Sequence, residues 1–283
     1  MGILNGKVAV VTGGTRGLGL SIAQAFAGEG AAIVVASRSQ QAVDAAVQQF
    51  SSKGQRAAGL AVDVGNLEQV EALARTAIQQ FGRLDVWVNN AGVAGPYGPT
   101  MGFAPETFYQ VAQTNIIGVY NGSRTAMHHF LSQRTGKLIN MLGHGYQGPV
   151  PWQNAYSASK AWVRSFTMSL AEETKESGVG VYAFNPGMVL TDLLTNVEVF
   201  SGSEDRLKQF PRVVRMWAKP PEQPARKAVW IASSATNGKT GLLISVFSPW
   251  LMMSGALKEG WRALLKRPTP IDTVRIRSVP PAV

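Results

Sequence analysis

Residues 7 to 26 read KVAVVTGGTRGLGLSIAQAF, and they contain three structural signals in succession. An apolar run leads into a glycine-rich turn, and helical spacing begins directly after it. Apolar runs without polar alternation are typical of strands covered on both faces. Glycine permits a tight turn and a close backbone approach, and the N-terminus of the next helix offers free N–H groups to a phosphate. The stretch therefore predicts a strand, a dinucleotide pyrophosphate site and a helix.

The same alternation of strand and helix continues along the chain. Similar apolar runs occupy 31–36, 57–62, 84–88, 137–142, 179–184 and 242–247. Segments with helical spacing occupy 17–29, 39–52, 66–81, about 106–133, 154–176 and 222–235. Strict alternation indicates a doubly wound α/β fold, with a seven-stranded parallel sheet, right-handed crossovers and helices on both faces.

Composition narrows the class of protein. With 283 residues, of which 45% are apolar, the chain can bury a sizeable core, and we expect one domain over residues 1–247. The absence of cysteine excludes a structural thiolate site, and no pattern indicates a metal. The net charge of +10 is dispersed and carries no nucleic-acid-binding motif, so we expect no nucleic-acid partner. The N-terminus enters the first strand without a secretory signal, which favours a cytoplasmic location.

Two regions interrupt the alternation. Residues 191–224 form a long polar and aromatic insertion that would lie beyond the carboxyl ends of the strands, where ligands bind, so we interpret it as a substrate lid. Residues 248–283 form a basic tail with an apolar helical stretch that is too short to span a bilayer. We expect the tail to pack on the body or on a partner subunit. A membrane-surface amphipathic helix is the alternative.

The end of the second strand indicates which dinucleotide binds. A free ribose is usually held there by an acidic side chain, whereas a 2′-phosphate requires a cation. The sequence has Ser37 and Arg38 at this point, and Arg16 lies in the glycine turn. This pattern favours NADP(H) over NAD(H). Asp63, after the third strand, could accept a hydrogen bond from the adenine amino group or could cap a helix.

A tyrosine and a lysine at helical spacing indicate proton transfer. Tyr156 and Lys160 are four residues apart at the start of a predicted helix. Carbonyl reduction by hydride transfer leaves an alkoxide, which needs a proton donor. An ammonium one helical turn away is expected to lower the high intrinsic pKa of the tyrosine.

Taken together, the motifs resemble those of the short-chain dehydrogenase/reductase family. The resemblance covers roughly residues 5 to 246 and rests on TGGTRGLG, AVDV, NNAG, TNIIG, YSASK and PGMVLT in this order. It implies a Rossmann-like fold with Tyr156 as catalytic acid/base. It further implies that Lys160 contacts the nicotinamide ribose and lowers the tyrosine pKa, and that Asn115 holds a water of the proton relay.

The resemblance and the charge pattern together predict a cofactor site for NADP(H). Its expected residues are Gly13, Thr15, Arg16, Gly17, Leu18, Gly19, Ser37, Arg38, Asp63, Val64, Asn90, Ala91, Gly92, Tyr156, Lys160, Pro186, Gly187, Val189 and Thr191.

One departure from the family lies in the active site. The family's serine hydroxyl, thirteen positions before the tyrosine, falls on Gly143. Three explanations stay open. Another donor could serve, such as His144, Tyr146 or a water; the substrate could be an activated carbonyl or an imine; or the chain could bind NADP(H) without catalysis, as a sensor or scaffold. Retention of Tyr156, Lys160 and Asn115 favours an enzyme.

A second departure is the tail, which replaces the family's short glycine-rich ending and puts its common tetramer in doubt, although we expect a homo-oligomer. The predicted substrate region is aromatic and weakly charged, which suits a hydrophobic or cyclic carbonyl compound. Its aromatic residues are Tyr97, Tyr146, Trp152, Phe200, Phe210 and Trp217.

Overall fold

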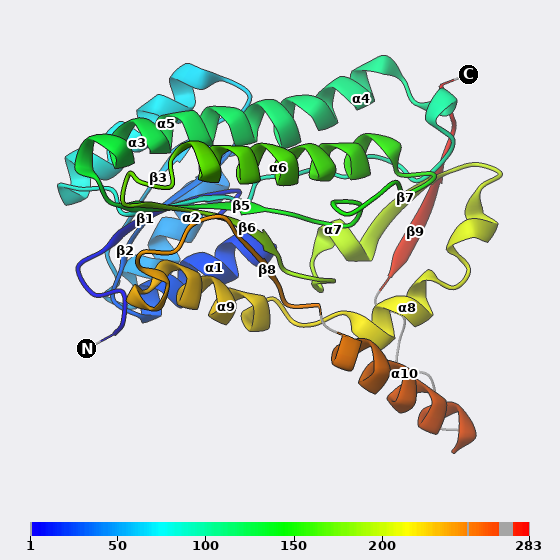
Figure 1. Ribbon diagram of the computed structural model, residues 1–283. Helices are drawn as coiled ribbons and strands as arrows, with labels where there is room; N and C mark the ends of the chain where they lie inside the picture. The colour runs from blue at the N-terminus through cyan, green and yellow to red at the C-terminus, as the bar shows by residue number, and fades with distance from the viewer. Residues whose placement is uncertain (1, 248, 266–273, 283) are drawn as a thin grey trace.

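The computed structural model describes residues 2–247, 249–265 and 274–282, and its centre is a seven-stranded parallel sheet (Figure 1). The strands follow the order β3-β2-β1-β4-β5-β6-β8. They are β1 (Val8–Thr12), β2 (Ala32–Ser37), β3 (Ala57–Ala61), β4 (Val86–Asn89), β5 (Gly136–Met141), β6 (Val179–Asn185) and β8 (Leu242–Ser245). The predicted fold class and all seven predicted strands are confirmed.

Helices cover both faces of this sheet (Figure 1). One face is covered by α1 (Gly17–Gly28), α2 (Gln40–Ser51) and α9 (Glu222–Ala232). The other is covered by α3 (Leu67–Phe81), α5 (Gly118–Gln133) and α6 (Asn154–Glu173). The predicted helix at 106–133 is one continuous run made of α4 (Pro105–Ala112), a π-turn η2 (Gln113–Ile117) and α5.

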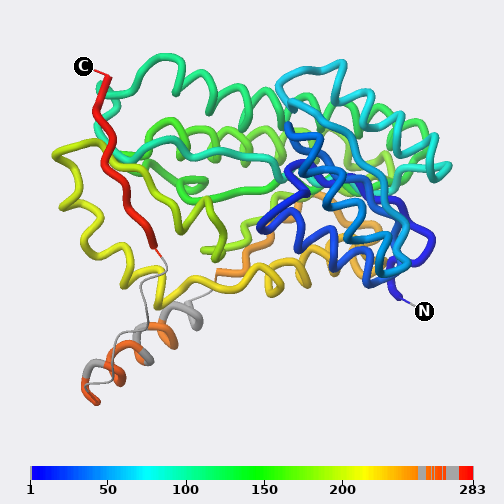
Figure 2. Tube along the Cα trace, turned by 180° about the vertical axis from the view of Figure 1, so that it is seen from behind, coloured from blue at the N-terminus to red at the C-terminus, as the bar shows by residue number. Residues whose placement is uncertain are grey.

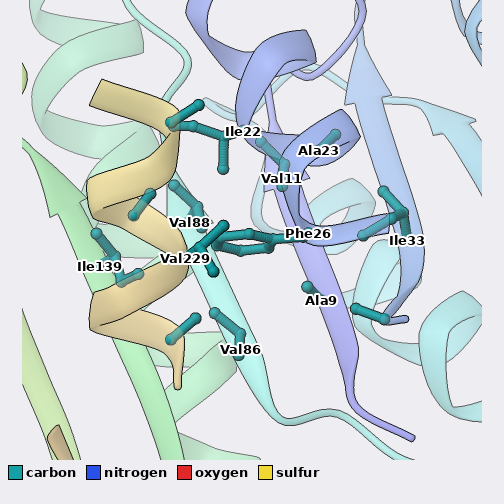
Figure 3. Close-up of a cluster of buried hydrophobic side chains, with 14 of the residues drawn as sticks. Ala9, Val11, Ile22, Ala23, Phe26, Ile33, Val86, Val88, Ile139 and Val229 are labelled. Carbon is teal, nitrogen blue, oxygen red and sulfur yellow. The ribbon is translucent and has the colours of Figure 1, made fainter. Parts of the chain in front are cut away.

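Alternate residues of each strand enter different cores, which explains the unbroken apolar runs. In β1, Ala9 and Val11 face the α1 and α9 side, whereas Val8 and Val10 face the α3 and α5 side. Figure 3 shows the first of these cores, where the fully buried ring of Phe26 lies among strand residues and the helix that carries Val229. Burial of one such side chain stabilises the fold by about 1.5–3 kcal/mol.

A buried polar network joins the central strands to the helices above them. Asn89 on β4 accepts a hydrogen bond from Trp87 Nε1 (2.8 Å) and donates to Asn140 Oδ1 on β5 (2.8 Å) and to Ser123 Oγ on α5 (3.1 Å). Asn140 in turn donates to Thr167 Oγ1 on α6 (3.0 Å). Because buried polar groups are costly without partners, the network fixes the relative positions of these elements close to the predicted active site.

The lid and the tail meet in a second, two-stranded parallel sheet. Strand β7 (Asn196–Phe200) belongs to the lid, and β9 (Arg275–Val279) belongs to the tail. Both views show β9 beside the lid, at the edge of the molecule far from the N-terminus (Figures 1 and 2). The lid also contains α7 (Asp192–Thr195), η3 (Glu204–Leu207) and α8 (Phe210–Trp217), and the tail contains α10 (Pro249–Leu264). Residues 248, 266–273 and 283 of the predicted tail lie outside the described residues.

Short helical turns complete the elements, with η1 at Thr100–Gly102 and η4 at Ser234–Thr236.

The prediction that the tail packs on the body holds in part, because β9 and α10 both contact the lid.

Candidate active site

The glycine turn after β1 has the geometry of an anion cradle. Gly13 and Gly17 adopt positive φ values of 63° and 53°, which disfavour side chains. A Cβ on Gly19 would lie 2.2 Å from the carbonyl oxygen of Gly13, so only glycine fits. Among the described residues, no side chain caps the N-terminus of α1, and its first turn contains no acidic residue. Free N–H groups at a helix start and a close backbone approach fit a pyrophosphate.

The end of β4 is tied to this turn. Asn90 Nδ2 donates to the carbonyl oxygens of Thr12 (3.0 Å) and Gly13 (3.2 Å). The Thr12 hydroxyl accepts from the backbone N–H groups of Asn90 (3.0 Å) and Ala91 (3.2 Å). The NNAG segment therefore shapes the turn by direct contact. The role of Thr12 is absent from the sequence prediction, and its position as the last residue of the first apolar run is the signal that could have revealed it.

The residues expected to choose between the two dinucleotides lie at the surface. Arg38 is exposed, and the Ser37 hydroxyl donates to the Ser39 carbonyl (3.3 Å). Arg16 is exposed as well, and its guanidinium lies 3.5 Å from a carboxylate oxygen of Asp192 in the lid. One oxygen of Asp63 accepts from the Gly65 N–H (2.9 Å) in a local turn. The N-cap of α3 is Asn66 rather than Asp63, and the adenine contact stays a prediction.

The segment after β6 runs back to the glycine turn. Gly187 has a φ of 74°, and its N–H donates to Asn185 Oδ1 (3.1 Å). Val189 is buried and forms an isolated bridge with Lys219. A Cβ on Gly17 would lie 3.2 Å from the Thr191 side chain, so this segment contacts the predicted pyrophosphate turn.

The remaining predicted cofactor residues differ in exposure. Thr15 is partly buried in the glycine turn, and Pro186 is buried after β6. Leu18 is partly buried against the core on the α1 and α9 side, and Val64 is 8% exposed in the core on the other face of the sheet. The Val64 carbonyl accepts a hydrogen bond from Asn121 (2.9 Å).

The side chains of Asn115 and Lys160 both lie close to Gly92. Asn115 lies in the π-turn η2 and is fully buried; its Nδ2 donates to Ser159 Oγ (3.0 Å) and to the Val93 carbonyl (2.9 Å). A Cβ on Gly92 would lie 3.4 Å from Asn115 Oδ1 and 3.8 Å from Lys160 Nζ. π-Turns inside helices are frequent at functional sites. Ser159 is another residue that the sequence reasoning missed, although it lies inside YSASK.

The Tyr156 hydroxyl occupies the space beside Gly143. A Cβ on Gly143 would lie 2.2 Å from Tyr156 Oη and 3.1 Å from Tyr156 Cζ. Lys160 Nζ lies 5.6 Å from the centre of the Tyr156 ring and donates to the Met141 carbonyl (3.1 Å). The space that a side chain at position 143 would occupy is therefore taken by the hydroxyl of Tyr156.

In this structure, burial opposes the expected lowering of the Tyr156 pKa by Lys160. Burial raises the pKa of Tyr156 to about 12, and burial lowers the pKa of Lys160 to about 8. The ammonium lies over the ring and is bonded to a backbone carbonyl, so its attraction for a phenolate does not offset the loss of solvent. At neutral pH Tyr156 is therefore a protonated phenol, the form that donates a proton.

His144 and Tyr146 were the suggested replacements for the missing hydroxyl. His144 is exposed in the loop after β5, and partial desolvation of its imidazole lowers its pKa, which favours the neutral ring with one N–H. Tyr146 is partly buried and packs with the cluster that contains Leu142 and Val163.

Several of the predicted pocket aromatics hold the lid in place. Phe200 on β7 is 5% exposed and contacts the Phe103 ring edge to face (5.1 Å). Trp152 has a φ of 71°, and the guanidinium of Arg206 lies 4.8 Å from the centre of its ring. Tyr97 donates its N–H to the Glu198 carbonyl (2.7 Å), which joins the loop after β4 to β7.

The two other aromatics lie on α8. Phe210 at its start is partly buried, and Trp217 at its end contacts Phe247 edge to face (6.3 Å).

Comparison with known proteins identifies the family. The sequence model described as short chain dehydrogenase matches residues 7–200. The chain therefore belongs to the short-chain dehydrogenase family. It is 35% identical over 245 residues to 3beta-hydroxysteroid dehydrogenase 1 of Eggerthella lenta, a match that covers 86% of this chain and 93% of that one. It is also 35% identical to a probable chloroplastic chlorophyll(ide) b reductase NYC1 of Oryza sativa, of whose length it spans 54%.

Solved structures of reductases share this fold. A 3-ketoacyl-(acyl-carrier-protein) reductase of Brucella melitensis, complexed with NADH, superposes with a TM-score of 0.76 at 28% identity over 86% of this chain and 97% of that one. An actinorhodin polyketide ketoreductase with NADPH gives a TM-score of 0.77 at 28% identity, over 87% and 97% of the two chains.

Within the part of the chain that the structure describes, no group of three or more His, Asp or Glu side chains could hold a metal ion. Within that part, every helix is too short or too polar to cross a membrane.

Proposed function

We propose that this short-chain dehydrogenase is an NADPH-dependent reductase that acts on a carbonyl group, or an activated carbonyl or imine, of a hydrophobic or cyclic small molecule. The observation that carries the proposal is geometric: the Tyr156 hydroxyl lies beside Gly143, Lys160 Nζ lies 5.6 Å from the centre of the Tyr156 ring, and Asn115 lies close to that lysine. The relatives named above include reductases and a dehydrogenase, and the name of the hydroxysteroid dehydrogenase indicates a cyclic, hydrophobic compound.

The chain's own residues suggest a division of labour. A bound nicotinamide cofactor would supply the hydride. The N–H groups at the start of α1 would hold its pyrophosphate, and the two exposed guanidinium groups of Arg16 and Arg38 would attract a 2′-phosphate. Tyr156 would donate its phenol proton to the developing alkoxide. Lys160, close to Asn115, would take part in returning a proton to the tyrosine.

The glycine at position 143 points to substrates that need little polarisation. Loss of one oxyanion donor typically lowers turnover about 10²- to 10³-fold. Because Tyr156 Oη fills the space beside Gly143, we propose that the phenol is the principal donor, with neutral His144 as an auxiliary one. Diketones, quinone-like rings and cyclic imines are therefore expected to react faster than simple ketones.

The decisive test measures NADPH oxidation against simple ketones, diketones and cyclic imines. Tyr156→Phe is expected to lower turnover at least about 10²-fold, because the proton donor is lost. Tyr109→Phe is the matched control, since it removes the hydroxyl of an exposed tyrosine on α4, and it is expected to retain activity. Turnover that survives Tyr156→Phe undiminished refutes the proposed role.

The cofactor preference has a separate test. Titration of NADPH and NADH fluorescence is expected to show preference for NADPH, and Arg38→Asp is expected to weaken NADPH binding about 10- to 100-fold. Arg75→Asp on α3 makes the same change of charge on an exposed residue and is expected to leave binding unchanged. Equal affinity of the unmodified protein for the two dinucleotides would contradict the NADP(H) assignment.

The absence of a side chain at Gly143 also favours a second candidate function, non-catalytic binding of NADP(H). With no hydroxyl at 143 and a tyrosine pKa of about 12, the chain could bind NADP(H) as a sensor or scaffold without turnover. Tight NADPH binding combined with no turnover on the whole panel would support this alternative.

We also infer a homo-oligomer and a cytoplasmic location, which light scattering and fractionation would test.

A further inference from the structure

Helix α10 turns an apolar face to solvent. Met253, Leu257, Trp261 and Leu264 are 50%, 58%, 62% and 73% exposed. They follow one another at intervals of four, four and three residues, so they lie on one side of the helix. Leu265, directly after the helix, is 53% exposed as well. Single exposed apolar residues are ordinary, whereas a continuous stripe of large ones marks an interaction surface.

Gly255 and Glu259 lie on the side of α10 that faces the lid. Gly255 is buried, and a Cβ there would lie 2.4 Å from the Met216 carbonyl and 2.8 Å from the Trp217 ring. Glu259 is 7% exposed; it bonds to Arg262 (2.7 Å) and lies 3.6 Å from Arg215 on α8. The hydrogen bond from Arg262 is the main cause that lowers the pKa of Glu259 to about 2. These contacts join α10 to α8, while Met253, Leu257, Trp261 and Leu264 stay exposed.

Charge indicates what covers the apolar stripe. Residues 249–267 contain Lys258, Arg262, Lys266 and Arg267, and Glu259 is the only acidic residue among them. The Glu259 carboxylate faces the lid and pairs with Arg262 and Arg215. The segment that carries the apolar stripe therefore has a net positive charge in its sequence. A two-fold contact with a second copy would place the same cationic excess against itself. An anionic lipid surface instead complements both features, because it accepts apolar side chains beneath a layer of negative charge.

The position of α10 allows such a contact. Both views show the helix projecting from a corner of the molecule, away from the central sheet and from the N-terminus (Figures 1 and 2). A helix of 16 residues is too short to cross a bilayer, so it would lie in the plane of the headgroups.

We propose that α10 docks this protein on an anionic membrane surface through Met253, Leu257, Trp261 and Leu264, with the lid beside the lipid. The proposal is independent of the proposed catalytic function.

Flotation of the full chain with lipid vesicles tests the docking surface. Vesicles of phosphatidylcholine alone are compared with vesicles that also contain phosphatidylglycerol, at low and at high salt. The chain is expected to bind the anionic vesicles at least about tenfold more strongly, and salt is expected to weaken binding. Leu257→Gln combined with Trp261→Gln is expected to lower binding to anionic vesicles about tenfold or more.

Matched variants separate docking from general hydrophobicity and from misfolding. Met101→Gln combined with Leu131→Gln removes two exposed apolar side chains elsewhere and is expected to leave vesicle binding unchanged. Leu264→Gln is a second, independent change on the stripe and is expected to weaken binding. Because all these side chains are exposed, thermal unfolding and NADPH binding are expected to stay as in the unmodified protein.

Three outcomes would overturn the proposal. The first is failure to bind anionic vesicles, and the second is binding that the stripe variants leave intact. The third is a dimer, seen by analytical ultracentrifugation, that the Leu257 and Trp261 changes dissociate while vesicles bind neither form. That result would show that a second copy covers the stripe.

Discussion

Because Tyr156 lies so close to Gly143, adding a single methyl group at position 143 is expected to have a large effect. In Gly143→Ala the new Cβ would lie 2.2 Å from Tyr156 Oη, whereas carbon atoms in contact are normally about 3.5–4.0 Å apart. The hydroxyl would have to move by about 1 Å or more. The backbone at position 143 is not left-handed, so the crowding is the principal strain.

The size of the effect follows from overpacking. Inserting a methyl group into a filled site costs about 1–3 kcal/mol of unfolding free energy. Tyr156→Phe removes the oxygen, after which the nearest tyrosine atom to the new Cβ is Cζ at 3.1 Å. The Gly143→Ala cost should therefore fall by about 1 kcal/mol or more in the Tyr156→Phe background. A displacement of the proton donor by about 1 Å should also lower NADPH turnover by up to about 10²-fold.

Urea denaturation of the unmodified protein, the two single variants and the double variant measures this coupling. Gly148→Ala, in the same loop, is the control: its Cβ would meet nothing within 4 Å, so stability is expected to stay equal or to rise by up to about 1 kcal/mol. A Gly143→Ala cost that is the same in both tyrosine backgrounds would refute the reasoning.

Three other predictions concern stability and the lid. Asn140→Ala should lower the free energy of unfolding by about 2–4 kcal/mol in urea, because it removes the Asn89 acceptor within a buried network; a cost below about 1 kcal/mol would contradict this. Stability in urea should rise with pH between about 8 and 10.5, because burial lowers the folded-state pKa of Lys137 and Lys160 to about 8 while the unfolded lysines still bind protons at these pH values. Lys137→Met should flatten the slope, and stability that falls with pH would contradict the assignment. Deleting residues 275–283 should leave thermal unfolding of the main sheet nearly unchanged but should speed limited proteolysis of the lid, since β7 loses its partner strand; a lid that stays equally resistant would argue against this role.

The main sheet was predictable because its signals are local. Each strand is buried on both faces, so neighbouring residues such as Val10 and Val11 enter different cores and the sequence shows an unbroken apolar run. The glycine turn was predictable for a similar reason, because steric limits at Gly13 and Gly19 leave no alternative residue. The pair of Tyr156 and Lys160 was indicated by helical spacing together with the resemblance of YSASK to the family motif, because the spacing alone often occurs by chance.

The features that were missed depend on long-range contacts. Strands β7 and β9 read as NVEVF and RIRSV, two short and partly charged runs that acquire strand structure by pairing with each other. The raised pKa of Tyr156 comes from the burial of its hydroxyl in the folded chain, and spacing along one helix cannot reveal it. The exposure of the apolar side chains of α10 becomes visible only when its contacts with α8 are known.

The small sheet of β7 and β9 also has a consequence for the order of folding. Its contacts join residues 78 or 79 positions apart, as in Ser201 with Val279 and Glu198 with Arg277. Closing such a loop costs conformational entropy before any pairing compensates, whereas the main sheet forms from adjacent strand and helix units. The lid should therefore be the last part of the molecule to become ordered during refolding. If the lid orders in a late kinetic phase, an intermediate should form in which the main sheet and its helices are folded but the lid does not yet cover the predicted substrate region.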